Sequence, residues 1–154
     1  MVKELKLLFS REAIAETIAS LGREISADYA DKKLVLVGVL KGAFVFLADL
    51  VSHLTIPAAI EFVILASYGS KKESSGQVIV KKDVEISLEG KDVLIIEDIV
   101  DTGLSLKFLV EHLRTHKPAS LKVCALVDKK ARRKVEVQVD YLGFAMVDGF
   151  IVGY

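Results

Sequence analysis

Apolar positions along the chain follow two patterns, and each pattern predicts one kind of element. After Ser10 they recur every three or four residues, at Ile14, Ile18, Leu21 and Ile25. This spacing places them on one face of a helix, and serine is a residue type that caps helix N-termini. Two later segments, 43–54 and 102–114, are also expected to be helical.

The second pattern is the short aliphatic run, which predicts a buried strand. The clearest runs are 34–37, ending at Gly38, and 93–96, followed by a polar turn; weaker ones lie at 60–65, 78–80, 84–86 and 121–127. The tail from 135 to 154 is expected to form two strands. Because strands alternate with helical segments, the chain is predicted to be α/β, with a mainly parallel central sheet flanked by helices. Neither a linker nor a repeat interrupts residues 1–154, which predicts a single domain.

Composition narrows the classes of function. Hydrophobic residues make up 52% of the 154 residues, enough for a substantial core. Lys plus Arg and Asp plus Glu both number 21, a balance that argues against binding nucleic acid or a membrane surface. One cysteine, Cys124, excludes an intrachain disulfide, and no apolar run is long enough to cross a bilayer. We therefore expect a soluble cytoplasmic protein.

One turn carries most of the candidate chemistry. It lies between the strand 93–96 and the following helix, and its polar or small residues are Glu97, Asp98, Asp101, Thr102, Gly103 and Ser105. Backbone N–H groups at a helix start bind anions, hydroxyls add donors, and glycine lets a ligand approach closely. Carboxylates repel phosphate, but they accept hydrogen bonds from ribose hydroxyls and hold Mg²⁺. A phosphorylated ribose with a bound metal suits both the anion-binding residues and the carboxylates of this turn. The alternative, a helix cap at Asp101 or Thr102, leaves the two preceding acids unexplained.

The nine residues 97–105, Glu-Asp-Ile-Val-Asp-Thr-Gly-Leu-Ser, resemble the phosphoribosyl-pyrophosphate (PRPP) motif of type I phosphoribosyltransferases. From about Phe9 to Tyr154, the order of motifs is most similar to that of the hypoxanthine-guanine phosphoribosyltransferases. The resemblance implies the type I fold, with a small hood formed by the C-terminal strands. It also implies a Mg²⁺-dependent reaction that converts PRPP and hypoxanthine or guanine to IMP or GMP and pyrophosphate.

The same resemblance implies roles for individual residues. Asp101 would be the general base facing the purine N7 proton, and the phosphate would bind Asp101, Thr102, Gly103, Leu104 and Ser105. Ribose and Mg²⁺ would be held by Glu97 and Asp98. Pyrophosphate would bind Lys41 and Gly42, where the family often has a cis Leu–Lys peptide. Without the family, Lys41 reads as a solvated lysine in an ordinary turn.

Three further segments match family elements. Ser67 and Tyr68, with the polar residues up to Gln77, resemble the flexible lid that excludes water. Lys129 would donate to the purine 6-oxo group, because an ammonium has donors only. Phe150 would stack on the base, and the backbone of Ile151 would read its edge. From the residues alone, Lys129 is a solvated lysine and Phe150 a core aromatic.

Some features depart from the family pattern and keep alternatives open. Residues 145–147, Ala-Met-Val, replace a more polar, proline-containing stretch, and family members usually continue beyond Tyr154 with an Asp and an Arg. The alternatives are a PRPP- or nucleotide-binding regulator without turnover, and a phosphoribosyltransferase for another base such as xanthine. The resemblance also implies a homodimer or homotetramer.

Two histidines have a spacing that can bind metal. His112 and His116 are four residues apart on the predicted helix, but no Glu follows the first as in zinc proteases. They lie near the helix C-terminus, where positive charge suits the helix dipole. We therefore expect both to be solvated. Cys124 lies in an aliphatic strand and is expected to be a small apolar core residue.

Overall fold

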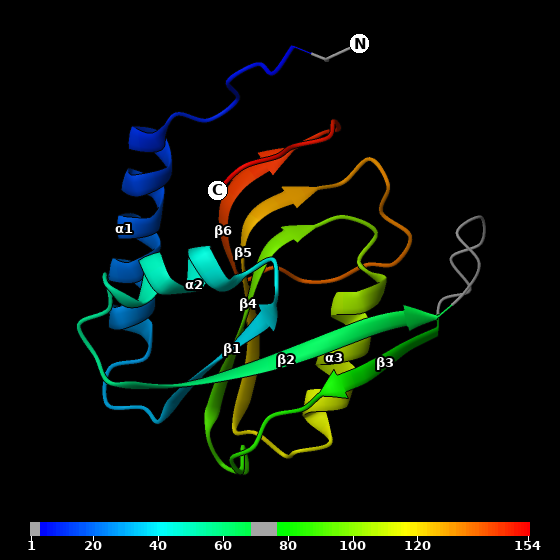
Figure 1. The fold of residues 1–154 in the computed structure, drawn as a ribbon. Coiled ribbons are helices and arrows are strands. Elements are labelled where there is room, and N and C mark those ends of the chain that lie inside the picture. The colour runs from blue at the N-terminus through cyan, green and yellow to red at the C-terminus, as the bar shows by residue number, and fades with distance from the viewer. Residues whose placement is uncertain (1–3, 69–76) are drawn as a thin grey trace.

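The computed structural model describes residues 4–68 and 77–154 as three helices and six strands in one sheet (Figure 1). In chain order they are α1 (Arg11–Asp28), β1 (Leu34–Leu40), α2 (Phe44–Val51), β2 (Ala58–Tyr68), β3 (Gln77–Lys82), β4 (Asp92–Val100), α3 (Leu104–Arg114), β5 (Ser120–Lys129) and β6 (Tyr141–Met146). None of these helices, within the ranges described, is long and apolar enough to cross a membrane.

The sheet has the strand order β3-β2-β1-β4-β5-β6. Every neighbouring pair is parallel except β2 and β3, which form an antiparallel hairpin. The predicted α/β fold with a mainly parallel sheet is therefore confirmed. In open parallel sheets, ligands bind beyond the carboxyl ends of the strands, here the ends of β1, β4 and β5.

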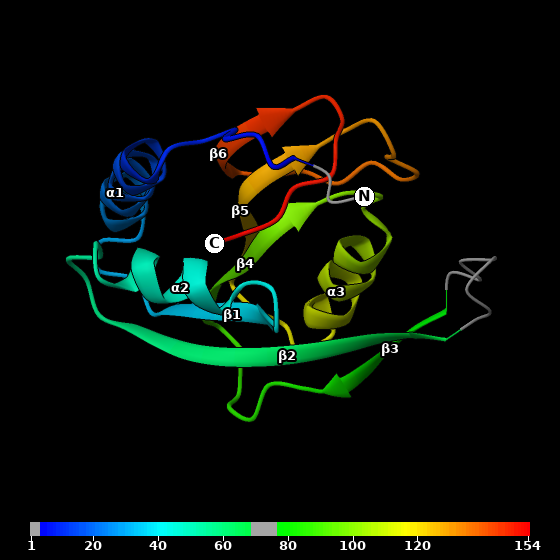
Figure 2. The ribbon, with the colours of Figure 1, turned by 45° about the horizontal axis from the view of Figure 1, so that its top comes forward.

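The core lies on both faces of the sheet, because the buried strands are apolar at consecutive positions. One face packs against α1 and α2, through residues such as Ile25, Leu36 and Ile96. The opposite face packs against α3, with Leu109, Val37 and Ile95 among its residues. Figure 2 shows α1 and α2 on one side of the sheet and α3 on the other. Cys124 is fully buried in the first cluster, as predicted.

The first helix begins where the sequence predicts. Ser10 is the N-cap of α1, and its side-chain oxygen accepts a hydrogen bond of 3.0 Å from the Ala13 N–H. Of the predicted apolar face, Ile18, Leu21 and Ile25 are buried, and Ile14 packs against the same cluster. We expect Ser10→Ala to lower the free energy of unfolding by about 1 kcal/mol, since it leaves that N–H without its cap.

Urea unfolding would measure this change, with Ser20→Ala as the matched control. Ser20 is exposed in the interior of the same helix, where alanine is the better helix former. If Ser10→Ala were as stable as the wild type, the cap would contribute nothing to stability.

Several predicted boundaries are wrong, mostly at strand ends. β1 continues through Gly38 to Leu40, and β4 continues through Glu97 and Asp98, which were expected in a turn. Backbone pairing explains this, because β4 stays in register with β5 up to Val100. Residues 84–86 are not a strand, and the tail has one strand, β6, instead of two. The expected hood therefore consists of β6 and an irregular final segment.

Candidate active site

Two turns meet at the carboxyl edge of the sheet, one after β1 and one at the end of β4. β1 and β4 are parallel neighbours, so their ends lie side by side. A Cβ atom on Gly42 would lie 2.7 Å from Oδ2 of Asp98, so only glycine fits there without displacing that carboxylate. The Leu40–Lys41 peptide is cis, as the resemblance implies, and Lys41 is exposed.

A cavity of about 270 Å³ opens beside the end of β4. Its lining residues are Val39, Leu65, Glu97, Ile99, Val100, Asp101, Thr102, Gly103, Ser105 and Leu106. Five of the residues predicted from segment 97–105 are in this set. The other predicted site residues, among them Asp98, Leu104, Lys41, Gly42 and Lys129, are not. A larger cavity of about 450 Å³ lies between α1, α2 and Tyr154, away from these strand ends and from the acids and hydroxyls of the turn. The smaller cavity is the candidate site, because the candidate chemistry lines it.

The turn into α3 differs from the expected helix start. The N-cap residue is Gly103, in a left-handed conformation with φ of 85°, and it makes no side-chain capping bond. The alternative of a helix cap at Asp101 or Thr102 is therefore excluded, and the predicted helix start at 102 is wrong by two residues, since α3 begins at Leu104. The Thr102 hydroxyl instead accepts a 3.4 Å contact from the Leu104 N–H. The N-terminus of α3, which is the positive end of the helix dipole, still borders the cavity.

Glu97 and Asp98 form a pair of neighbouring acids. Asp98 N–H donates to Oε1 of Glu97 at 3.2 Å, and Ile99 N–H donates to Oδ1 of Asp98 at 2.8 Å. Burial raises the pKa of Glu97 well above its usual range, and the adjacent Asp98 carboxyl raises it further. A divalent cation or a set of hydroxyl donors would offset the repulsion between the two acids.

This pKa shift predicts a pH dependence of stability. A carboxyl whose folded pKa is raised binds its proton more tightly in the folded state, so its contribution to stability is lost as pH rises from about 4.3, the unfolded value, through the folded pKa. Glu97→Gln cannot lose this proton. We expect its stability relative to the wild type to increase as pH rises. Urea unfolding of both proteins between pH 5 and pH 8 would show this; a constant difference would contradict it.

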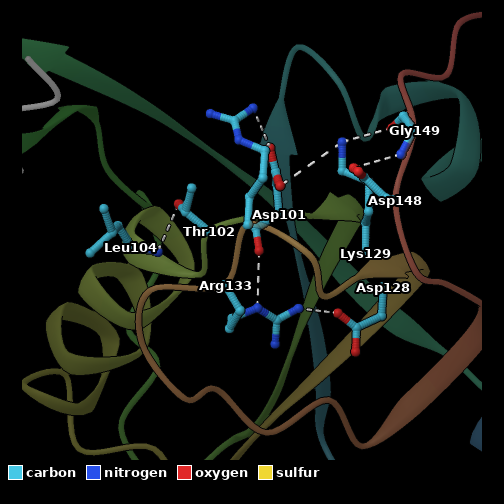
Figure 3. Close-up of polar contacts among 9 residues, drawn as sticks. Asp101, Thr102, Leu104, Asp128, Lys129, Arg133, Asp148 and Gly149 are labelled. Carbon is cyan, nitrogen blue, oxygen red and sulfur yellow. Dashed lines mark hydrogen bonds and ion pairs between the residues drawn. The ribbon is translucent and has the colours of Figure 1, made fainter.

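Asp101 lies at the centre of a cluster of cations (Figure 3). Arg132 donates to its Oδ2 at 3.1 Å, and Nζ of Lys129 lies 3.9 Å from its Oδ1. That Oδ1 atom is buried and has no hydrogen-bond partner among the described residues. A buried acceptor without a partner is costly, so a ligand proton at this position would be stabilised.

Arg133 connects the turn after β4 to the end of β5, and the sequence analysis missed it. Its Nε donates to the backbone oxygen of Asp101 at 3.0 Å, and its Nη2 donates to Oδ1 of the buried Asp128 (Figure 3). Its Cδ also packs where a Cβ on Gly103 would lie. The sequence does show that the strand run 121–127 is followed by an acid, Asp128, and then by a basic segment, 129–134. The charges of that segment do not reveal which basic side chain points toward Asp101 and Asp128.

Lys129 and the final segment lie together. Lys129 is only 8% exposed, so it is not the solvated lysine that the bare sequence favours, and Nζ donates to the backbone oxygen of Gly149 at 3.0 Å. Phe150 is 91% exposed, which excludes the alternative of a core aromatic. Ile151 is half-buried and packs against the core cluster on the α1 face. The exposed ring of Phe150 therefore belongs to the residue that follows Gly149, the hydrogen-bond partner of Lys129.

The predicted lid begins at the end of the β2–β3 hairpin. Ser67 and Tyr68 are the last residues of β2, and their backbones pair with Val78 and Gln77 of β3. Ser67 is exposed. The rest of the predicted lid, 69–76, lies outside the described residues.

Comparisons with known proteins agree with the geometry. A phosphoribosyl transferase domain model matches residues 6–154. Hypoxanthine-guanine phosphoribosyltransferases of Bacillus subtilis and Dictyostelium discoideum are 44% and 48% identical, over 97% of this chain and 83% and 85% of theirs. The crystal structure of a hypoxanthine phosphoribosyltransferase from Staphylococcus aureus superposes with a TM-score of 0.92 at 41% identity, covering 97% of this chain and 81% of that one. The predicted family is therefore confirmed: the chain belongs to the phosphoribosyltransferases, in the hypoxanthine-guanine group.

Proposed function

We propose that this chain transfers the phosphoribosyl group of PRPP to hypoxanthine or guanine, forming IMP or GMP and releasing pyrophosphate. The observation that carries the proposal is the placement of Asp101. Asp101 lines the cavity of the β4 turn, and its buried, unpartnered Oδ1 lies 3.9 Å from the Lys129 ammonium. This is where a sugar phosphate in the cavity and a base beside Lys129 would meet.

The 5′-phosphate would bind in the turn that leads into α3. The backbone N–H groups at the start of that helix supply donors, and the hydroxyls of Thr102 and Ser105, which line the cavity, supply more. Gly103 leaves the backbone accessible to the phosphate oxygens. Pyrophosphate would lie against Gly42 and the exposed Lys41, beside the end of β1.

The base would lie beside the final segment. Lys129 donates to a carbonyl in the free protein, and a purine 6-oxo group can take the place of that acceptor. Phe150 offers its exposed ring for stacking, which is worth about 1–3 kcal/mol. The Ile151 backbone would complete recognition of the base edge.

In the reaction, the bond from ribose C1′ to the pyrophosphate oxygen breaks and the bond from C1′ to purine N9 forms. The purine then loses its N7 proton, and Asp101 is the acceptor that we propose. The positive charge that develops on the ribose ring is offset by nearby carboxylates. Arg132 and Lys129 lie 3.1 Å and 3.9 Å from the Asp101 carboxylate oxygens, so cationic side chains surround the group that would accept the proton.

Mg²⁺ is the cofactor that we propose, and the donor set fits it. Two adjacent acids lie near the carboxyl end of β4, and oxygen ligands are those that Mg²⁺ prefers. Glu97 and Asp98 would hold the ion directly, through water or through the ribose hydroxyls. When bound, it would neutralise charge on the leaving pyrophosphate. A cytoplasmic location and a homodimer or homotetramer complete the proposal; the family supports the second, and the single buried cysteine is consistent with the first.

The test is nucleotide formation from PRPP and Mg²⁺ with hypoxanthine, guanine, xanthine and adenine in parallel. We expect turnover with hypoxanthine or guanine, none with adenine, and loss of turnover when EDTA removes the metal. Binding of PRPP without turnover on any base would favour the regulator instead. Turnover with xanthine alone would mean that the reaction is as proposed but that the substrate is xanthine.

A further inference from the structure

Three potential metal ligands meet at the end of α3 that faces away from the active site. Asp83 follows β3, His112 is in the last turn of α3, and His116 lies one turn further on. One ligand atom from each lies within 4.8 Å of the other two. The two histidines are not solvated as the sequence suggests: their side chains are 26% and 27% exposed.

The three side chains are already turned toward a common point. Oδ2 of Asp83 lies 2.8 Å from Nε2 of His112 and 3.5 Å from Nε2 of His116. Ligand atoms of a tetrahedral Zn²⁺ ion, bound at about 2.0–2.1 Å, lie about 3.3 Å apart. The two distances from Asp83 lie on either side of this value, so an ion can take the place of the proton between Asp83 and His112 after small side-chain movements.

The surroundings hold the ligands in place. Oδ1 of Asp83 accepts a 2.8 Å hydrogen bond from the Val84 N–H, which leaves Oδ2 for the histidines. Phe108 lies parallel to the His112 ring, with centroids 6.3 Å apart, and the two imidazoles meet edge-on at 5.3 Å. Oriented ligands of this kind raise metal affinity, because less side-chain freedom is lost on binding.

We propose that Asp83, His112 and His116 form a binding site for Zn²⁺ or a similar transition-metal ion. Two imidazoles and one carboxylate suit these metals, whereas Mg²⁺ and Ca²⁺ prefer oxygen ligands alone. Three protein ligands leave a fourth position for water. The site is separate from the PRPP cavity, since His112 is eight residues beyond Leu104, about 12 Å along the helix. The bound ion would tie the segment after the β2–β3 hairpin to α3.

Histidine-ring NMR tests the proposal, because the chain has three histidines and the third, His53, lies outside the cluster. One equivalent of Zn²⁺ is added to the untagged full chain at pH 7.5, without PRPP. We expect the ring signals of His112 and His116 to shift and those of His53 to stay. Ring signals are residue-specific, so binding of Zn²⁺ to the acids of the active site does not imitate this result.

Variants complete the test. His116→Gln and Asp83→Asn should each weaken Zn²⁺ binding at least tenfold, measured by competition with a chromophoric chelator, and His53→Gln should not. Thermal unfolding without metal checks that each variant is folded. The proposal is overturned if the His112 and His116 rings stay unshifted at ten equivalents, or if His116→Gln and Asp83→Asn both bind Zn²⁺ like the wild type. The cluster would then be only a hydrogen-bonded helix end.

Discussion

Asp101→Asn is expected to lower kcat for nucleotide formation by roughly 10²–10⁴-fold, the range that general acid–base groups contribute. An amide has the shape of the carboxylate but cannot accept the N7 proton. The exchange also removes the charge that compensates Lys129 and Arg132. Stability should change little, because the Arg132 pair is largely exposed and the bond from Arg133 goes to the backbone oxygen of Asp101.

Asp31→Asn is the matched control. Asp31 is exposed and has a φ of 62°, a conformation that asparagine adopts readily, so the same chemical change there should leave both activity and stability unaltered. Steady-state rates with hypoxanthine, together with a urea unfolding curve for each variant, measure the outcome. Unchanged kcat in Asp101→Asn would remove Asp101 from the mechanism.

Lys129→Ala is expected to relax the preference for 6-oxo purines. Hydrogen bonds from charged groups contribute about 1.5–3 kcal/mol, so kcat/KM for hypoxanthine should fall about 10- to 100-fold. Adenine offers no 6-oxo acceptor, so its binding, measured as competitive inhibition of the hypoxanthine reaction, should not weaken in parallel. The ratio of kcat/KM for hypoxanthine to the affinity for adenine is therefore the quantity to measure.

Lys130→Ala is the control for that substitution. Lys130 is the next residue, and it is exposed, so removing its charge changes the local field without removing a donor from the base position. The hypoxanthine-to-adenine ratio should then stay as in the wild type. If Lys129→Ala gave the same ratio as Lys130→Ala, Lys129 would not read the base.

Local patterns were sufficient to predict the helices, the buried strands and the segment 97–105 as the place of the candidate chemistry. The α1 face and its cap depend on residues within one or two turns of each other, and the aliphatic runs record burial directly. Glu97 and Asp98 were misplaced because an acid signals a turn in a local window. In the fold, pairing with β5 keeps them in strand conformation at the carboxyl edge of the sheet.

Contacts between distant residues explain the other errors. The Asp83–His112 bond joins residues 29 apart, and the bond between Arg133 and Asp101 joins residues 32 apart. A single sequence carries no record of such pairs. Residues 84–86 show the converse: their apolar pattern reflects Val84 packing against the α3-face core, without a partner strand.

The strand order divides the active site into halves that should open independently. Gly42 follows the central strand β1 and Asp98 lies near the end of the central strand β4, whereas Gly149 and Phe150 follow the edge strand β6. Amide hydrogens of central strands exchange only when the whole domain unfolds, whereas those of edge segments exchange through local opening. The final segment, which would hold the base, can therefore open locally to admit or release a purine. The residues at the ends of β1 and β4, which would hold the phosphoribosyl group, stay in place meanwhile.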